Sequence, residues 1–230
     1  SATKSGGEML VKCYRNTYGL PAIITRSMNI FGERQHPEKF IPKAINAALT
    51  GDKLSIHADS SKTRAGSRFY IHARNVADAY LFLIRELEAG KPIIGEDFHI
   101  TGEREVDNLE MAQFIAKTIG KPLNYEMVDF HTSRPGHDLR YSLDGNKIFA
   151  MGWKMPKTFE DSLSKTIYWM LEHDRWLQAD MPEVYSDLEA TLSSYKNFRL
   201  RYRPLRQEHE EHNADHSPAA AARRLHDYEA

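Results

Sequence analysis

The sequence has 230 residues and a mass of 26.5 kDa, which is enough for one large domain or two small ones around a buried core. Its 31 Lys and Arg residues against 32 Asp and Glu residues leave a formal charge of -1, so no basic surplus exists to attract nucleic acid or a membrane surface. The mean hydropathy of -0.59 argues against a membrane span, and the single cysteine, Cys13, excludes an internal disulfide and favours a reducing, cytoplasmic compartment.

Hydrophobic spacing predicts helices that alternate with short strands along the first 177 residues. Helices are predicted over residues 3–16, 40–49, 76–88, 108–118, 144–151 and 158–177. Short strands are predicted over residues 21–25, 54–57, 69–72, 98–100 and 123–128. Asn108 and Thr158 are the expected N-caps of the helices that they begin. This alternation predicts an α/β fold.

Four motifs carry a resemblance to a known family. They are SATK at residues 1–4, TRSMNIFG at 25–32, PEKFIP at 37–42 and RPGHDLRY at 134–141. Together they resemble the extended short-chain dehydrogenase/reductase superfamily, and within it the NAD-dependent nucleotide-sugar epimerases and dehydratases. The last motif is the most specific and is similar to that of the dTDP-glucose 4,6-dehydratases. The resemblance runs from the first residue to about Trp169.

The resemblance implies the C-terminal part of a Rossmann-like parallel sheet plus a smaller mixed α/β substrate domain. Residues 1–36 would be the last elements of the NAD-binding domain, residues 37–178 the nucleotide-sugar substrate domain, and residues 179–230 an extension with a mobile end. The sequence contains neither Gly-x-x-Gly-x-x-Gly nor Tyr-x-x-x-Lys. We therefore expect the C-terminal portion of a longer enzyme, inactive by itself and homodimeric when whole.

The resemblance assigns the cofactor and catalytic residues to the first two motifs. Lys4 matches the lysine of the family's YSATK motif, where its charge lowers the pKa of the catalytic tyrosine and where it also contacts NAD. Ser27 and Met28 match backbone beside the nicotinamide, and Asn29 matches a contact to the substrate diphosphate. Glu33 stands where the family has proline.

The remaining substrate contacts that the resemblance implies are spread along the chain. Lys39 and the following Phe40 match residues that bind the diphosphate, and a lysine is a compact cation with three donors for phosphate oxygens. Arg68 matches an arginine that forks onto the same diphosphate. Arg64 is its rival, because the polar loop over residues 59–67 is longer than in the family.

Three histidines and one further arginine complete the expectations. His57 stands where the family has an aromatic residue near the nucleobase, and Arg134 and His137 match contacts to phosphate and nucleoside. His99 replaces the asparagine that the subfamily usually has after a strand aromatic. The tail histidines, with His209 and His212 among them, have no cysteine partners, so we expect no metal site.

The implied reaction converts an NDP-hexose to its 4-keto-6-deoxy sugar with NAD as cofactor. Two alternatives stay open. One is a UDP-sugar epimerase or UDP-glucuronate decarboxylase of the same superfamily, against which RPGHD argues. The other is a non-catalytic fragment that only binds a nucleotide sugar.

Overall fold

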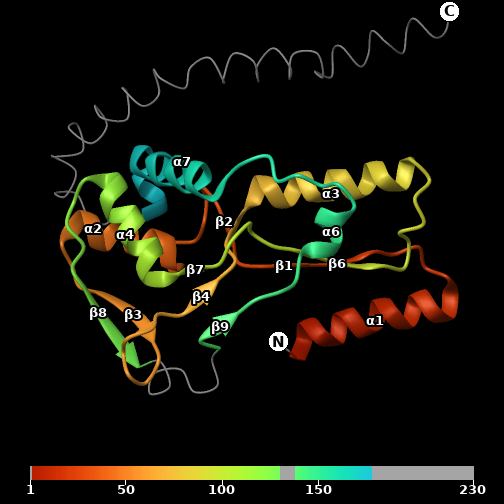
Figure 1. The fold of residues 1–230 in the computed structure, drawn as a ribbon, viewed down its shortest axis with the longest axis horizontal. Helices are drawn as coiled ribbons and strands as arrows, with labels where there is room; N and C mark the ends of the chain where they lie inside the picture. The colour runs from red at the N-terminus through yellow and green to blue at the C-terminus, as the bar shows by residue number, and fades with distance from the viewer. Residues whose placement is uncertain (1, 130–137, 178–230) are drawn as a thin grey trace, which may run out of the picture. The chain divides into compact units, whose positions relative to one another are not determined.

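The computed structural model describes residues 2–129 and 138–177, which lie within one unit, Ser1–Pro182 (Figure 1). The helices are α1 (Ala2–Tyr18), α2 (Phe40–Thr50), α3 (Ala73–Glu88), α4 (Asn108–Ile119), α6 (Asn146–Ala150), α7 (Phe159–Glu172) and the 3-10 turn η1 (Asp174–Leu177). The strands are β1 (Ile24–Ser27), β2 (Ile30–Phe31), β3 (Leu54–Ala58), β4 (Ser67–Arg68), β5 (Ile71–His72), β6 (Asp97–Ile100), β7 (Val106–Asp107), β8 (Tyr125–Asp129) and β9 (Arg140–Tyr141).

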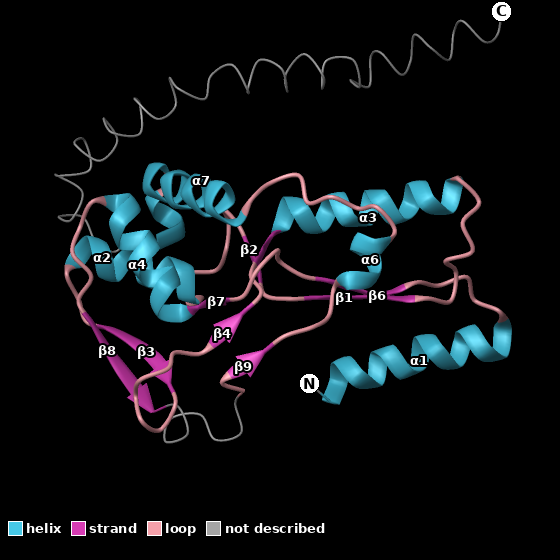
Figure 2. Ribbon diagram, in the orientation of Figure 1, coloured by secondary structure: helices cyan, strands magenta, loops and turns pink. Residues whose placement is uncertain are grey.

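The strands pair mostly in parallel, as an α/β fold requires (Figure 2). Strand β1 pairs with β6, β2 with β5, and β3 with β8, each in parallel. Strand β4 lies between β7, to which it is antiparallel, and β9, to which it is parallel. The predicted α/β class is confirmed.

Strand β6 shows why helices cover both sides of the β1–β6 pair. Phe98 and Ile100 are fully buried and belong to a core cluster with Val76, Ala79 and Leu83 of α3. Asp97 and His99 alternate with them and therefore face the other side, where α1 lies (Figure 1). The α3 side of the pair is thus apolar, whereas the α1 side is polar.

Capping residues set the helix ends. Thr158 caps α7 as predicted, with its hydroxyl accepting a hydrogen bond from the backbone N–H of Asp161 at 3.2 Å. The predicted cap of α4 is wrong by one residue, because the Asp107 carboxylate accepts from the N–H of Glu110 at 2.8 Å while Asn108 is already helical. Gly120 ends α4 with a positive φ of 75°, a conformation that glycine adopts without strain.

Several predicted boundaries shift. The strand predicted over residues 21–25 lies at Ile24–Ser27, and the helix predicted from residue 76 begins at Ala73. The long helix predicted to residue 177 ends at Glu172. The division at residues 36 and 178 stays a prediction, and the extension over 179–230 lies outside the described residues. Among the helices described, none is both long and apolar enough to span a membrane.

Candidate functional site

The carboxyl end of the β1–β6 pair gathers the residues predicted to lie near NAD. Strand β1 ends at Ser27, and the next residue, Met28, donates its N–H to the carbonyl of Ile100 at 3.0 Å. The Met28 side chain is 2% exposed, whereas Asn29 is exposed and its carbonyl accepts from the N–H of Ile71 at 3.1 Å. Ligands of open parallel sheets bind outside this edge, so these three residues lie where a cofactor would be expected.

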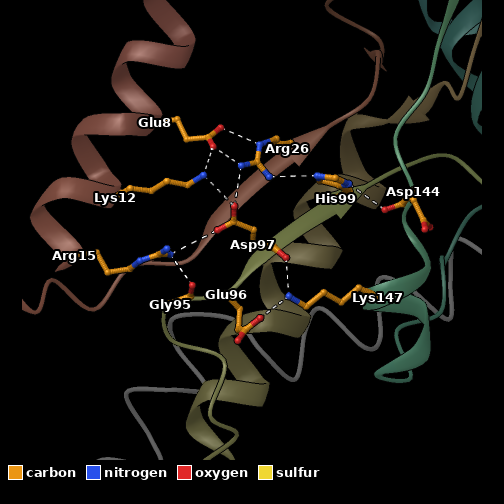
Figure 3. Close-up of polar contacts among 10 residues, drawn as sticks. All are labelled: Glu8, Lys12, Arg15, Arg26, Gly95, Glu96, Asp97, His99, Asp144 and Lys147. Atoms are coloured by element: carbon orange, nitrogen blue, oxygen red, sulfur yellow. Dashed lines mark hydrogen bonds and ion pairs between the residues drawn. The ribbon is translucent and has the colours of Figure 1, made fainter.

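Helix α1 runs antiparallel to β1 and points its first turn toward the same edge (Figure 3). Arg15, near the end of the helix, donates to the carbonyl of Gly95 at 2.6 Å, just before β6 begins. Glu8, two turns earlier, is bound by Arg26 near the end of β1. Lys4 lies one further turn toward the carboxyl edge and is exposed. The structure therefore directs Lys4 toward the edge that carries Ser27–Asn29.

The polar contacts between α1 and the sheet join charged groups whose pKa values are shifted. Hydrogen bonds from Arg26 and then Lys12 lower the pKa of Glu8 to about 2. Burial opposes the charge of Asp97, but its hydrogen bond with Arg26 and nearby cations outweigh burial and lower its pKa. The pKa of Arg26 is raised by its hydrogen bonds to the same two carboxylates. All three groups are therefore charged at neutral pH.

Arg68 is a buried arginine, and three of its five N–H donors bind backbone carbonyls. Only 9% of the residue is exposed. Its Nη1 donates to the carbonyls of Ser67 at 2.6 Å and Leu139 at 2.9 Å, and its Nη2 donates to the carbonyl of Asp138 at 2.8 Å. The guanidinium also lies 5.8 Å from the ring centre of Tyr141. Arg68 thus fastens the segment that follows the RPGH residues to strand β4.

The strand that carries Arg68 is braced on both sides. The hydroxyl of Tyr70 donates to Asn108 at 2.6 Å, and burial raises the pKa of Tyr70 to about 12. Arg140 of β9 donates to both carboxylate oxygens of Glu105, at 2.8 and 3.1 Å, and Ser67 donates to the same carboxylate. These hydrogen bonds, those of Arg140 first, lower the pKa of Glu105. The braces hold β4, β7 and β9 in one register.

The rival arginine, Arg64, lies in a different environment. The Asp59 carboxylate accepts from the backbone N–H groups of Thr63 at 3.0 Å and Arg64 at 3.2 Å, and these bonds lower the pKa of Asp59. The loop is thus closed on itself and leaves Arg64 exposed. The half-buried His57 accepts at its carbonyl from the N–H of Gly66, so His57 lies beside the end of this loop.

The predicted diphosphate residues that the structure describes are not linked to one another by hydrogen bonds or ion pairs. Lys39 precedes α2 with its side chain exposed, and Phe40 begins that helix half-buried. Among residues 2–129 and 138–177, no hydrogen bond or ion pair joins Lys39 or Phe40 to Asn29 or Arg68. Arg134 and His137 lie outside the described residues.

A cavity that the sequence did not predict begins at Ile30, directly after Asn29. It has a volume of about 460 Å³, and its lining includes Glu33, Arg34, Arg74 and Trp169. The Glu33 carboxylate lies 3.2 Å from Nε2 of His72 and 3.1 Å from Arg74, and the His72 contact is the largest cause that lowers the pKa of Glu33 to about 2. In the sequence, this place is marked only by Glu33, which stands where the family has proline. The residues that contact Glu33 lie about 40 positions further along the chain, and no sequence pattern links them to it.

Comparison with known proteins connects this geometry to a family. Residues 1–101 match the sequence model described as the NAD dependent epimerase/dehydratase family. The chain is 39% identical to dTDP-glucose 4,6-dehydratase of Haemophilus influenzae, over 74% of this chain and 51% of that protein. It is 38% identical to a trifunctional UDP-glucose 4,6-dehydratase/UDP-4-keto-6-deoxy-D-glucose 3,5-epimerase/UDP-4-keto-L-rhamnose-reductase of Arabidopsis thaliana, over 76% of this chain and 25% of that protein.

A solved structure agrees with these relatives. It is DesIV, the dTDP-glucose 4,6-dehydratase of Streptomyces venezuelae, with NAD and TYD bound. The TM-score is 0.64 at 34% identity, and the match covers 77% of this chain and 52% of that one. Residues 1–101 thus match the NAD dependent epimerase/dehydratase family, and the chain has the Rossmann-like α/β fold of these structural neighbours. Within that family it is homologous to the dTDP-glucose 4,6-dehydratases, of which it spans about half the length.

Proposed function

We propose that this chain is the C-terminal portion of an NAD-dependent nucleotide-sugar 4,6-dehydratase, which converts an NDP-hexose to the 4-keto-6-deoxy sugar and releases water. The observation that carries the proposal is the arrangement at the carboxyl edge of β1 and β6. There the first turn of α1, with Lys4, is directed toward Ser27–Asn29. The matches to dehydratases, which cover about three quarters of this chain and half of theirs, support it.

The residues at this edge fit one end of NAD. An exposed cation, Lys4, and strand-end backbone at Ser27 and Met28 suit the nicotinamide and its ribose. The sequence offers no glycine-rich turn for the pyrophosphate, so that part of the cofactor would be held by residues outside this chain. NAD supplies a hydride acceptor and donor at the sugar, and the reaction is redox-neutral overall.

The proposed roles of this chain are orientation and charge. Lys4 favours the ionised form of a tyrosine base that another part of the enzyme supplies. Asn29, Lys39, Phe40 and Arg68 bind the diphosphate, together with Arg134 and His137, and His57 lies near the nucleobase. Their binding energy, remote from the reacting carbons, orients the sugar in the transition state. We expect the whole enzyme to be a cytoplasmic homodimer.

The first test reads the coding sequence upstream of Ser1. An in-frame YSATK, preceded by Gly-x-x-Gly-x-x-Gly, is expected, and its absence would favour a non-catalytic nucleotide-sugar-binding module. The polypeptide so defined is then incubated with dTDP-glucose or UDP-glucose, and the products are analysed by mass spectrometry. A dehydratase gives a product that has lost one water, whereas an epimerase gives an isomer of unchanged mass. An isomer alone would overturn the dehydratase assignment and leave the family standing.

A further inference from the structure

Helix α1 has no fully buried residue, and Val11 is its only half-buried apolar one, so apolar packing contributes little to where the helix lies on the sheet. The structure instead shows a ladder of polar contacts between the helix and the strands (Figure 3). Arg15 contacts Gly95 and Asp97, Lys12 contacts Asp97 at 3.7 Å, and Glu8 contacts Arg26. A helix held in this way depends on the geometry of a few charged groups.

Arg26 is the most connected member of the ladder. Its Nε donates to Glu8 Oε2 at 2.9 Å, and its Nη2 donates to Glu8 Oε1, which makes a bidentate fork. The same Nη2 donates to Asp97 at 2.8 Å, and Nη1 lies 3.3 Å from Nε2 of His99. One guanidinium thus joins α1 to both strands of the β1–β6 pair.

The position of the fork decides how far Lys4 extends along the sheet. Lys4 and Glu8 are four residues apart, so they lie on the same face of the helix about 6 Å apart along its axis. Arg26 is the second-last residue of β1, immediately before the Ser27–Asn29 stretch. A helix that slid or tilted at Glu8 would therefore carry Lys4 away from that stretch, whereas the contacts of Arg15 would still hold the other end.

The contact with His99 connects Arg26 to the segment before α6. Because the Arg26 guanidinium can only donate, Nε2 of His99 must accept and the ring proton must lie on Nδ1. That Nδ1 lies 3.1 Å from the carbonyl of Asp144, to which it donates. Arg26 is thereby connected, through His99, to the segment that follows β9, the strand with which the RPGHDLRY motif ends.

We propose that Arg26 is a positioning residue, which holds α1 through its fork on Glu8 so that Lys4 stands at the carboxyl edge of β1. The inference rests on the proposed function of Lys4. Arginine suits this role better than lysine, because only a planar guanidinium makes the bidentate contact and reaches Asp97 at the same time. In this proposal Arg26 acts through Lys4, because its guanidinium contacts only Glu8, Asp97 and His99 among the described residues.

The test uses the intact enzyme that contains this chain, in a double-mutant cycle of R26A and K4A. A displacement of about 1 Å in a catalytic group costs about 100-fold in rate, so R26A is expected to lower kcat about 100-fold. The affinity for dTDP should stay within about twofold. In the K4A background, R26A should cost less than about threefold more, because both changes remove the same effect. If the double variant lost kcat by the product of the two separate losses, Arg26 would not act through Lys4.

A pH profile separates positioning from a general loss of structure. Displacing the Lys4 charge raises the pKa of the base, so the acid limb of kcat in R26A should move to higher pH. R26K should behave like R26A, and full activity in R26K would refute the argument from the fork. K147A is the matched control, because Lys147 binds Glu96 and the carbonyl of Asp97 but does not contact α1. It should retain the wild-type kcat and profile.

Hydrogen exchange tests, independently of activity, whether Arg26 holds α1 in place. R26A should lose amide protection in α1 and keep it in α3, and E8Q serves as a milder second variant if R26A does not fold. Unchanged protection of α1 in both variants would overturn the proposal. If the wild-type enzyme has no dehydratase turnover, the proposed function is wrong. A loss of amide protection in α1 of R26A would even then show that Arg26 holds this helix.

Discussion

Arg68→Ala is the substitution whose consequence follows most directly from the structure. It removes three hydrogen bonds to carbonyls, at 2.6 to 2.9 Å. Water can replace the donor at Asp138, which is exposed, but not readily at the half-buried Ser67 and Leu139. Hydrogen bonds from a charged donor contribute about 1.5–3 kcal/mol each, so two uncompensated losses predict a drop of about 3–6 kcal/mol in the free energy of unfolding.

Urea unfolding, followed by circular dichroism, measures this loss. Calorimetry with dTDP measures the second expectation, a roughly tenfold weaker affinity, because one charge-assisted contact to a diphosphate is removed. Arg64→Ala is the control: its side chain is exposed, so stability should change by less than about 0.5 kcal/mol and affinity not at all. If Arg64→Ala weakens dTDP binding and Arg68→Ala does not, the alignment of the loop is wrong. Unchanged stability in Arg68→Ala would refute the reading of its carbonyl contacts.

Three further changes probe other contacts. The pKa of Glu33 is lowered to about 2 in the folded state, so the ionised carboxylate stabilises the fold above pH 4.5 and this stabilisation is lost as the pH falls toward 2. Glu33→Gln should therefore lower the free energy of unfolding by about 1–2 kcal/mol at pH 7 and leave it unchanged near pH 2, as measured by thermal unfolding at a series of pH values. Phe98→Ala, in the fully buried core, should cost about 3–5 kcal/mol in urea, and a loss below 1 kcal/mol would contradict its packing. Trp153→Phe removes the 2.8 Å hydrogen bond to Asp78 and should cost about 1.5–3 kcal/mol, whereas Asp78→Asn should cost less.

Local patterns were enough to predict the helices, because each helix is built from residues near one another in the chain. The apolar spacing of residues 40–49 and the glycine after them predicted α2, which ends at Thr50 with Gly51 in the left-handed conformation. The side chain of Thr158 was likewise sufficient to predict the start of α7. The cap of α4 was misplaced because Asp107 and Asn108 are both good caps, and only the backbone angles distinguish them.

The motifs also indicated the family, and the comparisons confirmed it. They could do so because residues 1–4, 25–32 and 37–42 are contiguous stretches, each recognisable without knowing what it contacts. The roles that the resemblance gives to Lys4 and Lys39 remain predictions, since the structure leaves both side chains exposed.

Only the tertiary structure decided which distant residues meet. The pairing of β4 with β9 joins residues more than 70 positions apart through strands of two residues, which are too short to carry an alternating pattern. For the same reason, nothing in the sequence placed the Arg68 donors on the carbonyls of Asp138 and Leu139, or the Arg26 fork on Glu8. A side chain's type states what it can bind, but its partner depends on how strands and helices pack, and that is a property of the whole fold.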